Sequence, residues 1–111
     1  MMSTNETLAI PNPIQRVLLE KAAKAAGISL NWSSDRGFGE YGCFARWNAL
    51  EDNGDAMAIA SKLLMSMHLD HHVARTWIGE HVIEINQPGN PYANLRLAIV
   101  RLAAQMIDPA A

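Results

Sequence analysis

The chain has 111 residues, of which half are hydrophobic, and a formal net charge of −2 at pH 7. This size and composition indicate a single folded domain with one core. The acidic balance argues against general binding to nucleic acid or to anionic membranes, which requires an excess of basic residues. The lone Cys43 cannot form an internal disulfide, as is typical of proteins in a reducing cytosol.

A polar, unpatterned stretch over residues 1–11 predicts a flexible N-terminal tail, followed by a single domain over residues 12–111. Asn12 and Pro13 predict the start of the first helix, because asparagine suits the N-cap and proline the first helical position. Gly27 is the expected stop. The apolar stripe expected to face the core consists of Ile14, Val17, Leu18, Ala22 and Ala25.

The next segment predicts a hairpin. Apolar and polar residues alternate over residues 28–32, and residues 43–47 read as the returning strand. Residues 33–42 between them form a glycine-rich connection. Residues 37–42 match the pattern G-x-G-x-x-G, but a dinucleotide site needs that pattern between a strand and a helix. A flexible hairpin loop is therefore favoured over a nucleotide site, and a small-ligand loop remains the alternative.

Residues 47–67 carry the strongest pattern of the chain. Apolar residues at helical spacing predict a helix over residues 53–66, with Asp52 or Asn53 as its cap and Asp55 against the positive end of its dipole. Its expected buried face consists of Ala56, Ile59, Ala60, Leu63, Leu64 and Met67.

A second hairpin is expected from residues 69–78 paired with 81–85 across a turn at Gly79 and Glu80, unless residues 68–75 prolong the helix. Asn90 and Pro91 start the last helix, and Asp108-Pro109 ends it. This helix has a second apolar edge, so it is either buried on two sides or forms a homodimer surface. The residues of that edge are Leu97, Val100 and Ile107.

The predicted order is α-β-β-α-β-β-α. Hairpins and helices without long crossovers predict an α+β fold in which three helices pack on an antiparallel sheet of about four strands. Neither an export signal nor an apolar run long enough to span a membrane is expected, so the cytoplasm is the predicted location.

Four histidines gather near the second hairpin. On a helix His68 and His72 would share a face, as zinc ligands at i and i+4 do, and His81 could approach them across the hairpin. These three are weak candidates for a metal site, and a polar, solvent-facing strand is the ordinary alternative. No complete catalytic set is recognised, and no cofactor is predicted.

Aromatic residues supply the candidates for binding. At least two of the three tryptophans are expected in the core, and an exposed tryptophan would mark a contact surface. The candidate contact residues are Trp32, Arg36, Phe38, Tyr41 and Trp77.

Three stretches resemble a known family. They are residues 18–28 (LLEKAAKAAGI), residues 47–56 (WNALEDNGDA) and residues 97–104 (LAIVRLAA). Together they are similar to the phage ABA-sandwich domain, a family of small bacteriophage and prophage proteins. The Trp-Asn…Gly-Asp-Ala core is the most specific part, although Ala49 stands where the family commonly has proline. The resemblance implies a fold and a phage context and no catalytic residues.

These observations favour a small non-enzymatic phage or prophage accessory protein. It would act in the cytoplasm of the infected or lysogenic host by binding a host or phage protein, for example as an inhibitor of host defence of the anti-CRISPR kind. The alternative is a module that binds a small ligand or a metal through the glycine-rich loop or the histidine-rich hairpin.

Overall fold

The computed structural model describes residues 8–40 and 45–111. In these residues the helices are α1 (Pro13–Ala25), α2 (Asn53–Lys62) and α3 (Pro91–Ile107). The strands are β1 (Leu30–Ser33), β2 (Gly37–Glu40), β3 (Arg46–Trp47), β4 (Ser66–Leu69), β5 (Ala74–Ile78) and β6 (His81–Ile85). None of these helices is long and apolar enough to cross a membrane.

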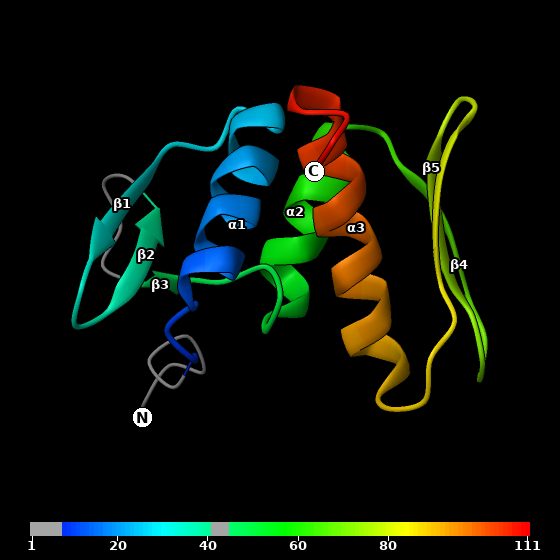
Figure 1. The fold of residues 1–111 in the computed structure, drawn as a ribbon, viewed down its shortest axis with the longest axis horizontal. Coiled ribbons are helices and arrows are strands. Elements are labelled where there is room, and N and C mark those ends of the chain that lie inside the picture. Colours follow the sequence, from blue (N-terminus) through cyan, green and yellow to red (C-terminus); the bar gives the residue numbers. More distant parts are fainter. Residues whose placement is uncertain (1–7, 41–44) are drawn as a thin grey trace.

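The three helices form a middle layer with one small sheet on each side (Figure 1). Strands β1, β2 and β3 form the first antiparallel sheet, and β4, β5 and β6 form the second. The prediction of an α+β domain is confirmed. The prediction of one sheet with about four strands is wrong, because the helical layer separates two three-stranded sheets and each sheet buries only one face.

Helix α1 begins as predicted. Asn12 accepts a hydrogen bond from the backbone N–H of Gln15, and the Gln15 side chain accepts one from the backbone N–H of Asn12. Its buried face differs from the predicted stripe, since Leu19, Ala22 and Ala23 are the buried residues of the helix. Ile14 and Val17 are 83% and 49% exposed. The helix turns its Leu19 side toward the core, which leaves the Ile14 side in solvent.

Helix α2 ends at Lys62, earlier than the predicted residue 66. The backbone N–H of Met65 bonds to the carbonyl of Ala60, and that of Leu64 bonds to Ser61, which is the Schellman pattern. Leu64 takes the left-handed position with φ of 55° that Gly27 takes after α1. The chain then extends into β4, so residues 66–69 are a strand that the sequence did not predict.

The second hairpin is confirmed over β5 and β6, which are joined by the two-residue turn at Gly79 and Glu80. Its first strand is shorter than the predicted 69–78, because Leu69 ends β4 and residues 70–73 connect β4 to β5. The first hairpin differs from the prediction. Its expected loop contains an unpredicted strand, β2, which pairs with β1, and the end of the predicted return strand is β3, which pairs with β2 instead of β1. Residues 43 and 44 of the predicted return strand lie outside the described residues.

Helix α3 starts at the Asn90 cap as predicted. It packs against α1 and α2 on one side and against β5 and β6 on the other. Val100 is fully buried, and Leu97 packs on the small core beneath the second sheet. The second apolar edge of α3 is therefore used mainly inside the domain, although Ile107 at its end is 42% exposed.

Candidate functional site

A row of aromatic side chains crosses the first sheet. Trp32 lies opposite Phe38, and Phe38 lies opposite Trp47, so each strand contributes one ring. The ring centroids are 4.8 Å and 6.3 Å apart, and both pairs meet edge to face. Phe38 and Trp47 are buried between this sheet and the helices, whereas Trp32 is half-buried. The row therefore runs from the core to the surface and ends at Trp32.

Arg16 of α1 covers the ring of Trp32. Its guanidinium carbon lies 4.1 Å from the ring centroid, a cation–π contact. The Arg16 Nε also bonds to the Glu20 carboxylate at 3.1 Å, one helical turn further along. Phe38 on β2 and Arg16 on α1 therefore contact the indole from two different elements.

Apolar side chains next to Trp32 are exposed. Ile10 and Val17, which line a groove together with Trp32, are 44% and 49% exposed. Ile14, three residues before Val17 on the same face of α1, is 83% exposed. A shallow groove of about 660 Å³ runs through this region and includes Trp32 in its wall. The complete lining is Ile10, Pro11, Pro13, Arg16, Val17, Glu20, Trp32 and Ser34. Contiguous exposed apolar residues of this kind are typical of protein-binding surfaces.

Two further grooves also have Trp32 in their walls. One, of about 410 Å³, lies between α1 and β1, and the other, of about 160 Å³, lies beside the turn that joins β1 to β2. Both reach Phe38, and the smaller one contains the exposed Arg36. We define the Trp32 surface as Trp32, Arg16, Ile10, Ile14 and Val17 with these three grooves.

The predicted contact residues divide into separate groups. Trp32, Arg36 and Phe38 belong to one region, although Phe38 is only 3% exposed and supports the surface from below. Trp77 is half-buried on the second sheet, which lies across the helical layer (Figure 1). Tyr41 lies outside the described residues.

Sequence reasoning missed the exposed stripe of α1 and its neighbour Ile10. The available signal was a surplus of apolar residues on the helix, because Leu19 and Ala23 form a second stripe beside the one that contains Ile14 and Val17. The contact between Arg16 and Trp32 joins residues 16 positions apart, and no local pattern indicates it.

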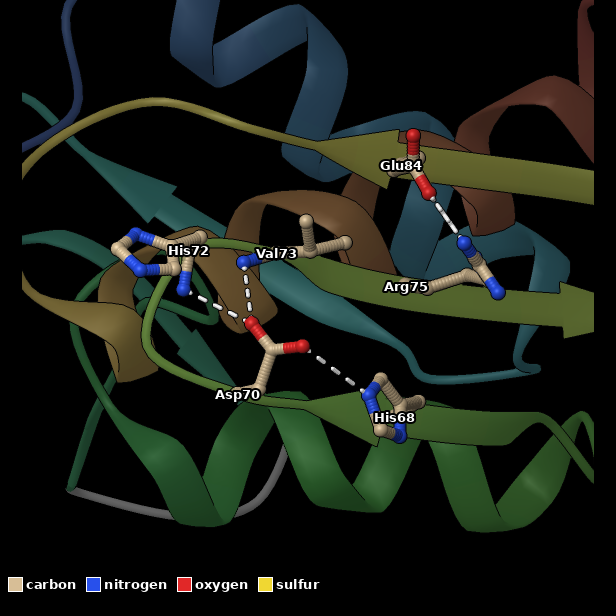
Figure 2. A network of polar contacts seen from close by, with 6 residues as sticks. All are labelled: His68, Asp70, His72, Val73, Arg75 and Glu84. Carbon is tan, nitrogen blue, oxygen red and sulfur yellow. Dashed lines mark hydrogen bonds and ion pairs between the residues drawn. The ribbon is translucent and has the colours of Figure 1, made fainter.

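Asp70 organises the connection after β4. One of its carboxylate oxygens accepts hydrogen bonds from the backbone N–H groups of His72 and Val73 at 2.8 and 2.9 Å (Figure 2). The other lies 3.4 Å from His68 Nε2. The two backbone hydrogen bonds lower the pKa of Asp70 to about 2, with a smaller contribution from His68. This carboxylate therefore shapes the turn between β4 and β5.

The predicted histidine candidates do not converge. His68 lies opposite Arg75, near one end of the sheet, whereas His81 lies opposite Ile78 at the other end. The side chain of His72 points away from His68 in Figure 2. Across the described residues, no group of three His, Cys, Asp or Glu side chains could hold a metal ion.

Asp55 is a partly buried carboxylate in the first turn of α2. It accepts a hydrogen bond from the backbone N–H of Asn48 at 2.9 Å. Burial raises the pKa of Asp55 to about 6; the hydrogen bond from Asn48 opposes this, and the nearby carboxylates of Asp52 and Glu40 add to it. The Asp52 side chain caps the helix by accepting from the Asp55 N–H, as predicted.

We expect Asp55→Asn to stabilise the protein at pH 7 by about 1 kcal/mol. The raised pKa means that the folded chain binds this proton more tightly than the unfolded chain, so wild-type stability falls as pH rises from about 4 to 6. The full shift corresponds to about 3 kcal/mol, and solvent screening of a half-buried group reduces it. Urea unfolding at pH 4.5 and 7 should show a smaller gain at the lower pH. An equal gain in the free energy of unfolding at both pH values would contradict the raised pKa of Asp55.

Comparison with known protein families, with curated proteins and with solved structures finds no match to this chain. Functional inference therefore rests on the residues and on the geometry of the Trp32 surface.

Proposed function

We propose that this protein is a small non-enzymatic bacteriophage or prophage accessory protein that acts by binding another protein. The observation that supports binding is the Trp32 surface, where a tryptophan packed against Arg16 shares a groove with the exposed Ile10 and Val17, and Ile14 extends the apolar stripe along α1. Tryptophan and arginine are the residue types most enriched at binding hot spots. Arg16 and Trp32 supply both at one place.

The phage context of the proposal rests on the resemblance of residues 18–28, 47–56 and 97–104 to the phage ABA-sandwich domain. We place the partner in the cytoplasm of the infected or lysogenic host, because a chain with a single cysteine and no internal disulfide is typical of a reducing compartment. A host protein is the proposed partner, and inhibition of a host defence system is one form that such binding takes.

We expect Ile14→Asp to reduce capture of the partner at least about tenfold, because it places a charge in the apolar stripe. Ile14 is 83% exposed, so the substitution should leave the fold intact. The measurement is affinity capture from a lysate of the bacterial host, with bound proteins quantified by mass spectrometry against a bead-only background.

The matched control is Val82→Asp. Val82 is 51% exposed and lies on β6 of the second sheet, so the same charge is added away from the Trp32 surface. Equal capture by wild type and by Ile14→Asp would contradict the proposal, as would an absence of any protein above background.

A further inference from the structure

Strand β1 has an open edge. Within residues 8–40 and 45–111 its one paired neighbour is β2. In the turn, the Ser33 carbonyl accepts from the Arg36 N–H at 3.3 Å, which places the pair of Ser33 and Gly37 at a hydrogen-bonded position. Hydrogen-bonded and non-bonded pairs alternate along an antiparallel ladder, so the backbone groups of Leu30 and Trp32 point away from β2. No backbone hydrogen bond from another described segment reaches them.

The groove of about 410 Å³ lies along this edge. Its lining, from both α1 and the segment that contains β1, is Glu20, Ala23, Lys24, Gly27, Ile28, Ser29, Leu30, Trp32 and Phe38. The side chains of Leu30 and Trp32 pack toward the helical layer. A strand added beside β1 would place its alternate side chains in the groove, because paired residues of neighbouring strands face the same way.

The groove of about 410 Å³ is lined by one carboxylate that has an ion-pair partner and one ammonium group that has none in the part of the chain that the structure describes. Glu20 is already paired with Arg16 at 3.1 Å. Lys24, in the last turn of α1, is exposed and makes no ion pair with any other residue in the described ranges. The unpaired cation at the Gly27 end of the groove favours an acidic group on the occupant.

We propose that this groove binds an extended, acidic peptide segment of the partner protein as a fourth strand of the first sheet. The segment runs antiparallel to β1, from Trp32 toward Gly27. Its backbone bonds to Leu30 and Trp32, two apolar side chains enter the groove, and an acidic side chain meets Lys24. This inference rests on the proposed function and states how the partner is held.

The test uses an array of amidated heptapeptides, Thr-X-Thr-X-Thr-Glu-Thr, in which X is Val, Ile, Leu, Phe or Tyr. Binding to the full chain is measured by fluorescence anisotropy. We expect at least one peptide to bind in the micromolar range, and a lysine in place of its glutamate to weaken binding about tenfold. Lys24→Glu should reverse that preference, which a merely structural role of Lys24 would not do.

Backbone methylation separates strand addition from simple apolar contact. N-methylation at the two X residues, which face Leu30 and Trp32, should abolish binding, whereas N-methylation at the threonines after each X should leave it within about threefold. Equal losses from the two methylated peptides would overturn the inference. It would also be overturned if no peptide bound at about 1 mM, or if sedimentation showed a dimer that excludes the peptide.

The two proposals fail in different ways. If Ile14→Asp no longer captures the lysate partner but the peptides do not bind, the Trp32 surface is supported as the binding surface and strand addition is wrong. If peptides bind through backbone pairing and Lys24→Glu also releases the lysate partner, both proposals are supported. If neither Ile14→Asp nor Lys24→Glu changes capture from the lysate, the proposed function is wrong. The peptide measurements alone then test whether the groove binds an added strand.

Discussion

Replacing Trp47 by alanine should lower the free energy of unfolding by about 4 kcal/mol. Trp47 is 4% exposed and lies in the main core, where it forms the buried end of the aromatic row. Its removal leaves a cavity between the first sheet and the helices. Many residues of that core, among them Ala49 and Ala56, have small side chains that are too short to fill a cavity of this size. Urea unfolding followed by far-UV circular dichroism measures the loss without relying on tryptophan fluorescence.

Trp77→Ala is the control for this prediction. The residue type is the same, but Trp77 is half-buried on the second sheet, outside both clusters of the core. Its loss should cost about 1 kcal/mol, because little apolar surface returns to water. Equal losses for the two substitutions would contradict the placement of Trp47 in the core.

Helix starts are the part of the fold that the sequence predicts best. Asn12 and Asn90 each precede a proline, and both cap a helix in the structure. The β5–β6 hairpin is likewise predicted from Gly79 and Glu80. These signals are local, because the cap and the turn involve residues only two to four positions apart.

The end of α2 could not be predicted from apolar spacing. Leu64 continues the helical pattern, but it adopts a left-handed conformation that normally favours glycine. Met65 and Met67 then pack against the same core from an extended chain. An apolar pattern reports which residues approach the core and cannot distinguish a helix from a strand that follows it.

The number of sheets depends on pairing between distant residues. Strand β2 contains two glycines, which strands generally disfavour, and so it was expected to be a loop. Gly37 has φ of 79°, and a Cβ there would lie 3.2 Å from the ring of Pro11. The positive φ and the close approach of the segment before α1 both favour glycine at this position, and the second reason lies outside the strand.

The candidate site was partly predictable. Trp32, Arg36 and Phe38 were expected to bind, and they lie together. The exposed stripe was not predicted, because α1 has two apolar edges and only packing against α3 decides which one is buried. Ile14 was placed in the core on periodicity alone and is 83% exposed.

Residues 47–56, on which the proposed phage context partly rests, have a structural role in this chain. Trp47 lies in the core, Asp52 caps α2, and Asp55 binds the backbone of Asn48. A Cβ on Gly54 would lie 3.1 Å from the Asp52 carboxylate. These contacts explain the spacing of the stretch without a ligand and separate it from the Trp32 surface.

Asn48→Ala should lower the free energy of unfolding by about 2–3 kcal/mol. Asn48 is 3% exposed, and its side chain donates to the carbonyl of Ala9 at 2.9 Å and accepts from the N–H of Leu50 at 3.0 Å. Alanine removes the partner of both backbone groups, and each of these hydrogen bonds is partly buried. Urea unfolding at pH 7 measures the loss.

The same substitution should loosen the segment before α1, because Asn48 joins it to the start of α2. Cleavage by proteinase K within residues 8–10, which form part of the Trp32 surface through Ile10, should therefore be faster. Asn31→Ala is the control, since Asn31 is exposed on β1 and its loss should cost less than about 0.5 kcal/mol. Unchanged stability in Asn48→Ala would show that water replaces its hydrogen bonds. Unchanged cleavage within residues 8–10 would show that the segment is held by its contact with Gly37 instead.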